Sequence, residues 1–234
     1  MGLRLLFALA LVAAPALAQP APPARLKAKL VAVNGDVIAI QAVSDAKARP
    51  GDDAQTRRVT LLPDTRYVES HKGGFSAIKP GDYVGATVTE GRNGALRATE
   101  IFLYDDALRG SGEGRFTDRD RLLVNGTVKA VQPNSPQDGN AGTVTLHYRG
   151  AMLEPRGKAN PVCVGRAVPA PFASALACEA DAAVQVSSGT PVSALAVGDR
   201  GLLAPGSIVT VTLAKAGGRD VAPGIIVEKP QSTP

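Results

Sequence analysis

Short runs in which every second residue is hydrophobic recur along the chain, and turn residues separate them. The first two runs, Leu26–Val33 and Asp36–Ala42, flank Asn34-Gly35, a dipeptide that hairpin turns favour because both central residues need a positive φ. Further strands are expected over RRVTLLP, TRYVES, DYVGATVTEG and ALRATEIFLY. No stretch of about 12 residues has a helical period, so helices are expected to be short or absent.

The same order of strand and turn signals appears twice. At a spacing of 125 positions, Ile78-Lys79-Pro80-Gly81 aligns with Leu203-Ala204-Pro205-Gly206, and Thr65 aligns with Thr190. Upstream, Leu30–Val33 aligns with Val128–Val131. Self-similarity of this kind indicates a duplicated structural unit, and the two copies cover residues 26–106 and 122–229.

Each copy is expected to form five to six short, mostly antiparallel strands. Closing such strands into a barrel removes the exposed edges that an open sheet would present. The sequence therefore predicts an all-β fold of two tandem small OB-like β-barrels, with a pair of SH3-like barrels as the alternative. The positions expected to point inward are Val31, Val33, Ile38, Ile40, Val59, Leu61, Val84, Val88 and Ile101.

The N-terminus has the features of a cleaved signal peptide. Arg4 precedes an apolar run, and Ala16-Leu17-Ala18 matches an A-x-A cleavage site, so the signal peptide is expected over 1–18. The run is shorter than the roughly 20 residues of a transmembrane helix. A proline-rich leader over 19–25 and a tail over 230–234 complete the expected organisation of a periplasmic or secreted protein without a membrane span.

Composition narrows the possible partners. Tryptophan is absent and aromatic residues are 4% of the chain, which excludes a large aromatic core and leaves few side chains for stacking on nucleic-acid bases. The formal net charge is +5, but the basic residues are scattered among acidic ones. Binding of nucleic acid is therefore not expected.

The second copy carries an insertion over 149–183 that contains both cysteines, Cys163 and Cys178. In an exported protein such a pair is typical of a disulfide, which would staple the insertion. Free or metal-bound thiols are the alternative, although the spacing differs from that of common zinc sites. The fragment ASALACEA within the insertion could form one or two helical turns.

Between the copies lies a glycine-rich segment, RGSGEGRF, inside an expected linker over 107–121. A phosphate-binding P-loop needs G-x-x-x-x-G-K-[ST] followed by a helix, and neither feature is present. An interdomain linker is the preferred interpretation, and a functional loop at the domain junction is the alternative.

Candidate chemistry is sparse. His71 beside Glu69, and the pair Asp105-Asp106, are the candidate metal ligands, although transition-metal sites need several converging ligands. No nucleophile, base and acid form a recognisable catalytic set, so no enzyme activity and no cofactor are predicted. Asn125-Gly126 is interpreted as a turn, and the N-G-T glycosylation motif there as a chance match.

The motifs I-K-P-G-D-Y-V-G, G-A-L-R-A-T-E-I and A-L-R-G-S-G-E-G together resemble an exported bacterial family of unknown function with OB-like repeats. Some of its members are labelled as components of metal ABC transporters. The resemblance covers most of the expected mature chain except the cysteine insertion, and it implies fold and export rather than an activity. The chain departs from the family at Arg115, where family linkers often have histidine.

These observations favour a non-enzymatic binding or scaffold module of the periplasm, with an envelope protein or a glycan as partner. Two alternatives remain open at this stage. One is an accessory metal-binding protein that uses His71, Glu69, Asp105 and Asp106, and the other is a hydrolase with its site between the domains.

Overall fold

The computed structural model describes residues 24–43, 56–118, 121–135, 138–152, 166–167 and 175–229. The expected signal peptide, most of the leader, the tail and Cys163 lie outside these residues. The described chain forms thirteen strands and three short 3₁₀ helices, η2 (Phe75–Ala77), η3 (Asp106–Leu108) and η4 (Arg200–Leu202). The prediction of an all-β fold with only short helices is confirmed. No helix in the described part is long and apolar enough to cross a membrane.

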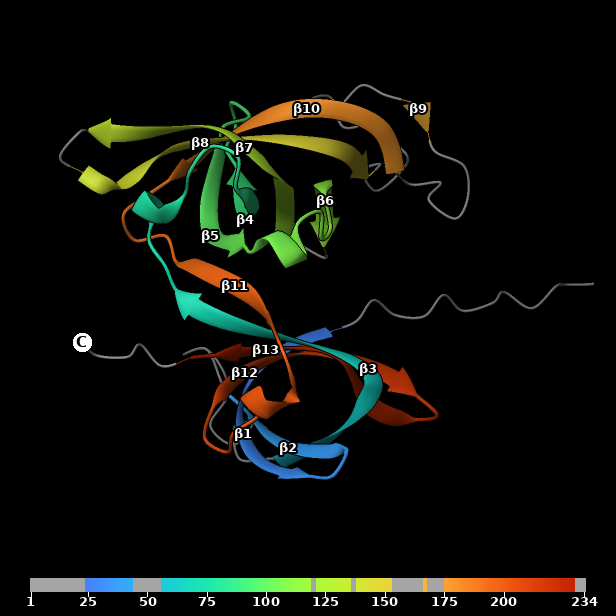
Figure 1. Ribbon diagram of the computed structural model, residues 1–234. Helices are drawn as coiled ribbons and strands as arrows, with labels where there is room; N and C mark the ends of the chain where they lie inside the picture. The colour runs from blue at the N-terminus through green and yellow to red at the C-terminus, as the bar shows by residue number, and fades with distance from the viewer. Residues whose placement is uncertain are drawn as a thin grey trace, which may run out of the picture.

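Five strands close into a mixed barrel, the lower body in Figure 1. Antiparallel pairing joins its strands in the order β13-β12-β1-β2-β3, and parallel pairing of β3 with β13 closes it. The strands are β1 (Ala24–Asn34), β2 (Val37–Ala42), β3 (Thr56–Lys72), β12 (Ile208–Ala216) and β13 (Arg219–Glu228). Their inward side chains form one apolar core that includes Leu30, Ile38, Ile40, Val59 and Ile225.

A second group of strands, which we call the second ring, forms the upper body in Figure 1. Its strands are β4 (Tyr83–Glu90), β5 (Leu96–Tyr104), β7 (Arg121–Ser135), β8 (Asp138–Met152) and β10 (Ala175–Val186). Antiparallel pairing joins them in the order β5-β4-β7-β8-β10, and two parallel residue pairs, Val184 with Leu96 and Gln185 with Arg97, join β10 back to β5. The short strands β6 (Gly114–Asp118) and β9 (Arg166–Ala167) flank β7 and β10.

The strand β11 (Val192–Gly198) connects the two bodies. It pairs antiparallel with the end of β3 and parallel with β5, and Figure 1 shows β3 and β11 side by side between the barrel and the second ring. The segments RRVTLLP and TRYVES, expected as two strands, are both part of the 17-residue β3. Because β3 continues past the barrel, its second half reaches the junction between the bodies.

The strands of the two sequence copies are interleaved. The first copy contributes β1, β2 and β3 to the barrel but β4 and β5 to the second ring, while the second copy contributes β7, β8 and β10 to the second ring but β12 and β13 to the barrel. The pairing thus differs from the two consecutive barrels predicted over 26–106 and 122–229. The physical reason is that β3 and β11 lead the chain from one body to the other. The last two strands of each copy follow β3 or β11 in the sequence, so they lie in the other body.

The hydrogen bonds repeat the spacing found in the sequence. Thr65 Oγ1 accepts from the Leu62 amide and donates to the Ala222 carbonyl, and Thr190 Oγ1 makes the equivalent bonds with Ser187 and Ala98. Ser70 and Leu195 are equivalent positions of the two copies, and they pair with each other in the β3–β11 ladder. The residue pairs on one side of this central pair are repeated on the other side with the two copies interchanged. A pseudo-two-fold axis therefore passes between these two strands.

Seven of the nine predicted inward positions are buried, but the two on β1 are not. Val31 is 44% exposed, whereas Val33 is partly buried and packs against the barrel core, and Ala28 and Leu30 are fully buried. A bulge between Leu30 and Ala32 changes the register of β1 against β2, and a one-residue shift moves side chains to the opposite face.

Two local expectations also change. The hairpin loop between β1 and β2 is Gly35-Asp36, one residue later than expected, with Gly35 at φ 53°. The fragment ASALACEA, expected to be helical in part, lies largely within strand β10 from Ala175 onward.

Candidate functional site

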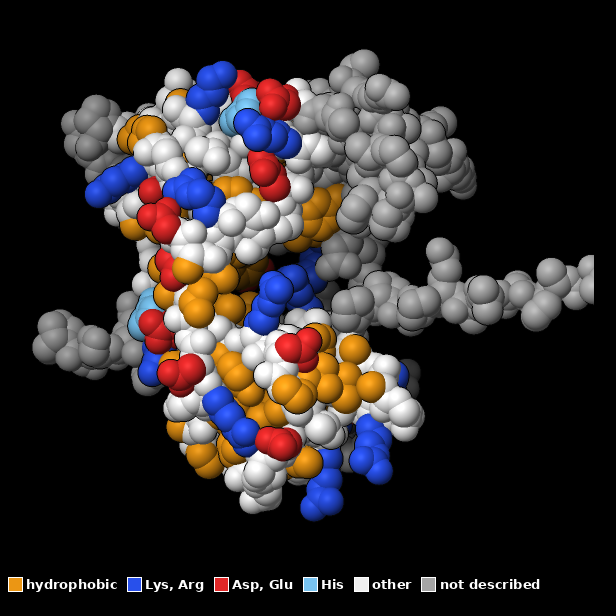
Figure 2. Space-filling view, turned by 45° about the vertical axis from the view of Figure 1, so that its right-hand side comes forward, with side chains coloured by type: hydrophobic (Ala, Val, Ile, Leu, Met, Phe, Trp, Pro, Cys, Tyr) orange, Lys and Arg blue, Asp and Glu red, His pale blue; other side chains and the backbone are white. Residues whose placement is uncertain are grey.

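A cavity of about 300 Å³ lies between the barrel and the second ring. Figure 2 shows the hollow between the two bodies, with basic side chains at its edge. Elements of both bodies and of both sequence copies contribute to its wall. The described lining residues are Arg25, Arg66, Val68, Gly85, Ala86, Thr87, Phe102, Tyr104, Leu108, Ser111, Gly112, Phe116, Leu123, Asn125, Leu195 and Ile226.

The cavity lies across the pseudo-two-fold axis. Strand pairing makes Arg25 on β1 equivalent to Leu123 on β7, because each pairs with the matching position of β12 or β4. In the same way Phe102 on β5 is equivalent to Ile226 on β13. Equivalent positions of the two copies thus face one cavity, and there they differ in polarity and size.

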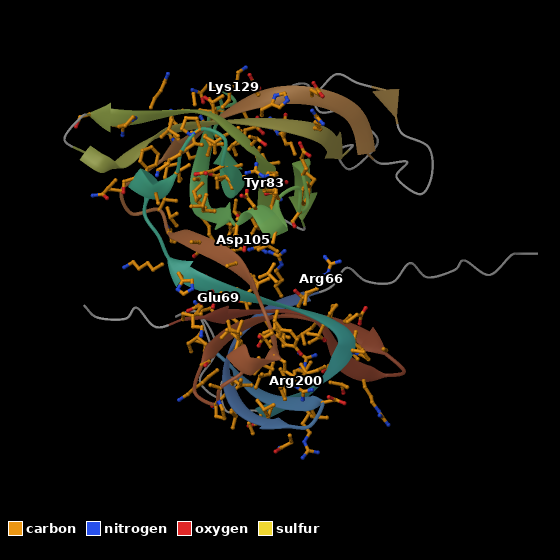
Figure 3. All side chains as sticks on the ribbon, in the orientation of Figure 1. Arg66, Glu69, Tyr83, Asp105, Lys129 and Arg200 are labelled. Atoms are coloured by element: carbon orange, nitrogen blue, oxygen red, sulfur yellow. The ribbon has the colours of Figure 1, made fainter. Side chains whose placement is uncertain are left out.

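Two arginines give the cavity its charge. Arg25 and Arg66 are both exposed residues of the barrel strands, and no other charged residue belongs to the described lining. Neither arginine forms a salt bridge with another described residue, and Figure 3 shows Arg66 at the junction of the two bodies. The wall is therefore electropositive on its barrel side.

The second ring supplies an aromatic wall around Tyr104. Its ring packs against Tyr83 with centroids 5.5 Å apart and planes tilted by 53°. Gly85 makes this packing possible, because a Cβ atom there would lie 2.9 Å from Tyr104 and 2.7 Å from Asn125 Oδ1. Burial raises the pKa of the Tyr104 phenol, with a smaller opposing effect of Arg25, so the hydroxyl is a hydrogen-bond donor at neutral pH.

The glycine-rich segment forms another wall. Tyr83 donates to the Ser111 carbonyl at 3.2 Å, and the buried Asn125 amide donates to the Gly112 carbonyl at 2.8 Å. Gly110 and Gly112 have positive φ values of 82° and 61°, which glycine adopts without steric cost. The expected linker over 107–121 is thus bonded to the second ring, and it includes the end of η3 and strand β6.

Asn125 and Gly126, expected to form a turn, lie within strand β7, where Asn125 is 5% exposed. Sequence reasoning missed Arg25, Arg66 and Asn125 as lining residues. Neither Arg25 nor Arg66 belongs to a recognisable sequence motif, and only the interleaving of the strands brings the two residues to one cavity.

Glu100 on β5 is a half-buried carboxylate near this junction. Burial raises its pKa, while Arg121, Arg25 and Lys27 partly offset that effect. Lys27 also forms a salt bridge of 2.8 Å with Glu228. Neither Glu100 nor Glu228 belongs to the described lining of the cavity, so these two acids do not form a catalytic pair within it.

The candidate metal ligands lie on another surface. His71 is at the end of β3, with Nε2 3.3 Å from the Glu69 carboxylate. Asp105 caps η3 by accepting from the Leu108 amide, and it also accepts from the Val197 amide, while Asp106 pairs with Arg109 at 2.9 Å. His71, Asp105 and Asp106 line one open hollow, but no group of three or more potential ligands close enough for one metal ion occurs among the described residues. The metal-site hypothesis stays a prediction.

Of the cysteine pair, only Cys178 lies in a described strand, β10, so the predicted disulfide with Cys163 also stays a prediction.

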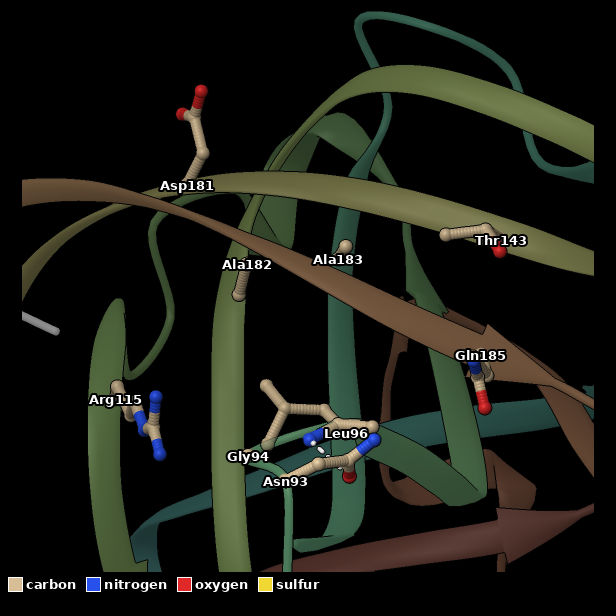
Figure 4. A pocket seen from close by; sticks show the side chains of 10 residues that line it. Asn93, Gly94, Leu96, Arg115, Thr143, Asp181, Ala182, Ala183 and Gln185 are labelled. Atoms are coloured by element: carbon tan, nitrogen blue, oxygen red, sulfur yellow. Dashed lines mark hydrogen bonds between the residues drawn. The ribbon is translucent and has the colours of Figure 1, made fainter. Parts of the chain in front are cut away.

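A further hollow lies beside β10, with Arg115 on its wall (Figure 4). Arg115 is 5% exposed and donates to Glu90 at 3.0 Å, and Tyr148 is fully buried in the same ring. Burial raises the pKa of the Tyr148 phenol, while the neighbouring Arg115 lowers it. Arg115 Nε is buried and has no hydrogen-bond partner among the described residues, whereas the Nη2 of the same guanidinium is held by Glu90.

Comparison of the chain with protein-family models, with curated proteins and with solved structures yields no significant match, so the cavity and its geometry carry the functional argument.

Proposed function

We propose that this protein is a non-enzymatic binding protein of the bacterial cell envelope, built from two interleaved OB-like units, whose ligand occupies the cavity between the barrel and the second ring. The single observation that supports this proposal is the difference between the two copies at that cavity. Where the copies share residues, as at Thr65 and Thr190, the residues serve the strand and turn geometry. Where equivalent positions face the cavity, as at Arg25 and Leu123, the copies differ.

The dimensions and chemistry of the cavity agree with this role. A volume of about 300 Å³ is at the lower end of the range for small-molecule sites, which are mostly apolar with a few polar groups. The described wall is mainly aliphatic and aromatic and includes polar groups on Tyr104, Ser111 and Asn125. The occupant is therefore a small ligand, or one projecting group of an envelope protein or a glycan.

A hydrolase is the second candidate, favoured by the raised pKa of Glu100 at the junction. It ranks lower because the described cavity wall offers no acid and no nucleophile beside a base. The accessory metal protein ranks lower still, because the pair Glu69 and His71 provides two ligands and zinc sites need at least three.

The test is a thermal-shift and calorimetric screen of small molecules against the mature protein and two variants. Leu123→Trp fills the cavity from β7, whereas Val31→Trp adds the same ring on the exposed face of β1. A ligand that binds the native state raises its melting temperature. The proposal expects compounds that bind the wild type and Val31→Trp but not Leu123→Trp. It is contradicted if no compound binds, or if every binder is indifferent to Leu123→Trp.

A further inference from the structure

The charge of the cavity wall is unbalanced. Among its sixteen described residues, two are arginines and none is acidic or a lysine. Arg66 has no hydrogen-bonded or ion-paired partner among the described residues. Guanidinium groups bind carboxylates through paired, charge-assisted hydrogen bonds, so two unpaired arginines on one wall favour an anion opposite them.

No described carboxylate forms an ion pair with either arginine. Arg25 attracts the carboxylate of Glu100, and Arg121 and Lys27 attract the same carboxylate. Glu228 is held by Lys27 at 2.8 Å. The positive charge at the cavity therefore faces the space that a ligand would occupy.

The charged and aromatic parts of the wall come from opposite bodies. Arg25 and Arg66 project from barrel strands, while Phe102, Tyr104 and Phe116 belong to the second ring and its strand β6. The equivalents of the two arginines are Leu123 and Pro191, which carry no charge. A ligand thus meets cations on one side only, and this polarity gives it one preferred orientation.

On the basis of the proposed function, we infer that the ligand is a small carboxylate with a flat apolar body, with its carboxylate at Arg25 and Arg66 and its body between Phe102, Tyr104 and Phe116. Tyr104, another lining residue, carries a hydroxyl that can provide a further donor. Both arginines are exposed, so their attraction to a carboxylate weakens as salt screens it.

The experiment compares three probes with the same body, 2-naphthoate, 2-naphthamide and 2-naphthylmethylamine, by calorimetry on the mature protein at low salt. The inference expects the carboxylate to bind about tenfold more tightly than the amide, and the amine to bind more weakly than both. In Arg25→Gln/Arg66→Gln the preference for the carboxylate should disappear. Lys29→Gln, which removes an exposed cation of β1 outside the described lining, should preserve it.

The outcomes separate this inference from the proposed function. If the amide binds as tightly as the carboxylate, and Leu123→Trp still abolishes binding, the cavity is a binding site but the anionic ligand class is wrong. A carboxylate preference that survives loss of both arginines also overturns the inference. If none of the three probes binds, the inference fails, and the wider screen decides on the proposed function. If the probes bind but their binding is unaffected by Leu123→Trp, both the inference and the proposed function fail.

Discussion

The ion pairs of Asp220 connect the two copies within the barrel, and their removal has a calculable effect. Arg57 Nε on β3 donates to Asp220 Oδ2 at 2.6 Å, and Lys215 Nζ lies 2.7 Å from Oδ1. The hydrogen bond from Arg57, followed by that from Lys215, lowers the pKa of Asp220 from 3.8 to about 2. At about 1.4 kcal/mol per pKa unit the shift corresponds to roughly 2.5 kcal/mol. The cations are 43% and 66% exposed, so solvent screening reduces this to roughly 1 kcal/mol.

The pH dependence follows from the direction of the shift. Because the folded-state pKa is lowered, the stabilisation is complete above the unfolded-state value near 4 and is lost as the pH falls from about 4 to about 2. We therefore expect Asp220→Asn to lower the free energy of unfolding by roughly 1 kcal/mol at pH 7, and by progressively less below pH 4. Urea denaturation followed by circular dichroism measures both values.

A double-mutant cycle with Arg57→Gln isolates the bond between the copies. Asp106→Asn is the matched control, because that carboxylate is 91% exposed and pairs with Arg109, the residue that follows its own short helix, so the effect should stay below about 0.5 kcal/mol. A coupling energy of zero between Arg57 and Asp220, or an Asp220→Asn cost that does not change with pH, would refute the reasoning.

Three further predictions concern buried and strained positions. Burial raises the pKa of Glu100 in the folded protein, so the stability of the wild type falls as the pH rises and this carboxyl loses its proton. Glu100→Gln should therefore stabilise the protein at pH 8 but not at pH 4, as measured by urea titration. Gly85→Ala places a Cβ 2.7 Å from a neighbouring oxygen and should cost about 1–3 kcal/mol, whereas Gly189→Ala meets open space and should cost less than about 0.5. Leu30→Ala should cost about 2–5 kcal/mol and Val31→Ala less than about 0.5, and equal costs would contradict the observed register of β1.

The sequence shows the repeat because each copy keeps the residues that strands and turns require. Thr65 and Thr190 make the same bonds with their backbone neighbours, and Ile38 and Ile40 alternate with partly buried residues as a half-buried strand does. Such local features were sufficient to predict an all-β chain with two related units. The position of Val31 was wrong because a bulge changes which face a residue occupies, and alternation alone does not reveal a bulge.

The interleaving of the strands could not be predicted from the sequence, for a different reason. Alternation shows which face of a strand is buried, but it does not show which strand lies beside it. The parallel pairing of β3 with β13 joins Tyr67 to Ile225, residues from different copies. The cavity depends on this long-range pairing. Without knowledge of the pairing, nothing distinguishes Arg25 and Arg66 from other exposed arginines.

The interleaved architecture that forms the cavity is tested most directly by dividing the chain between Asp118 and Arg121. The barrel needs β1, β2 and β3 from one half and β12 and β13 from the other, so neither half contains a complete ring. The measurement is the ¹H–¹⁵N spectrum of the labelled half 19–118, alone and after addition of unlabelled 121–234. We expect a poorly dispersed spectrum for the isolated half and a well-dispersed spectrum, typical of a folded protein, for the mixture. A dispersed spectrum of the isolated half that the partner leaves unchanged would contradict it.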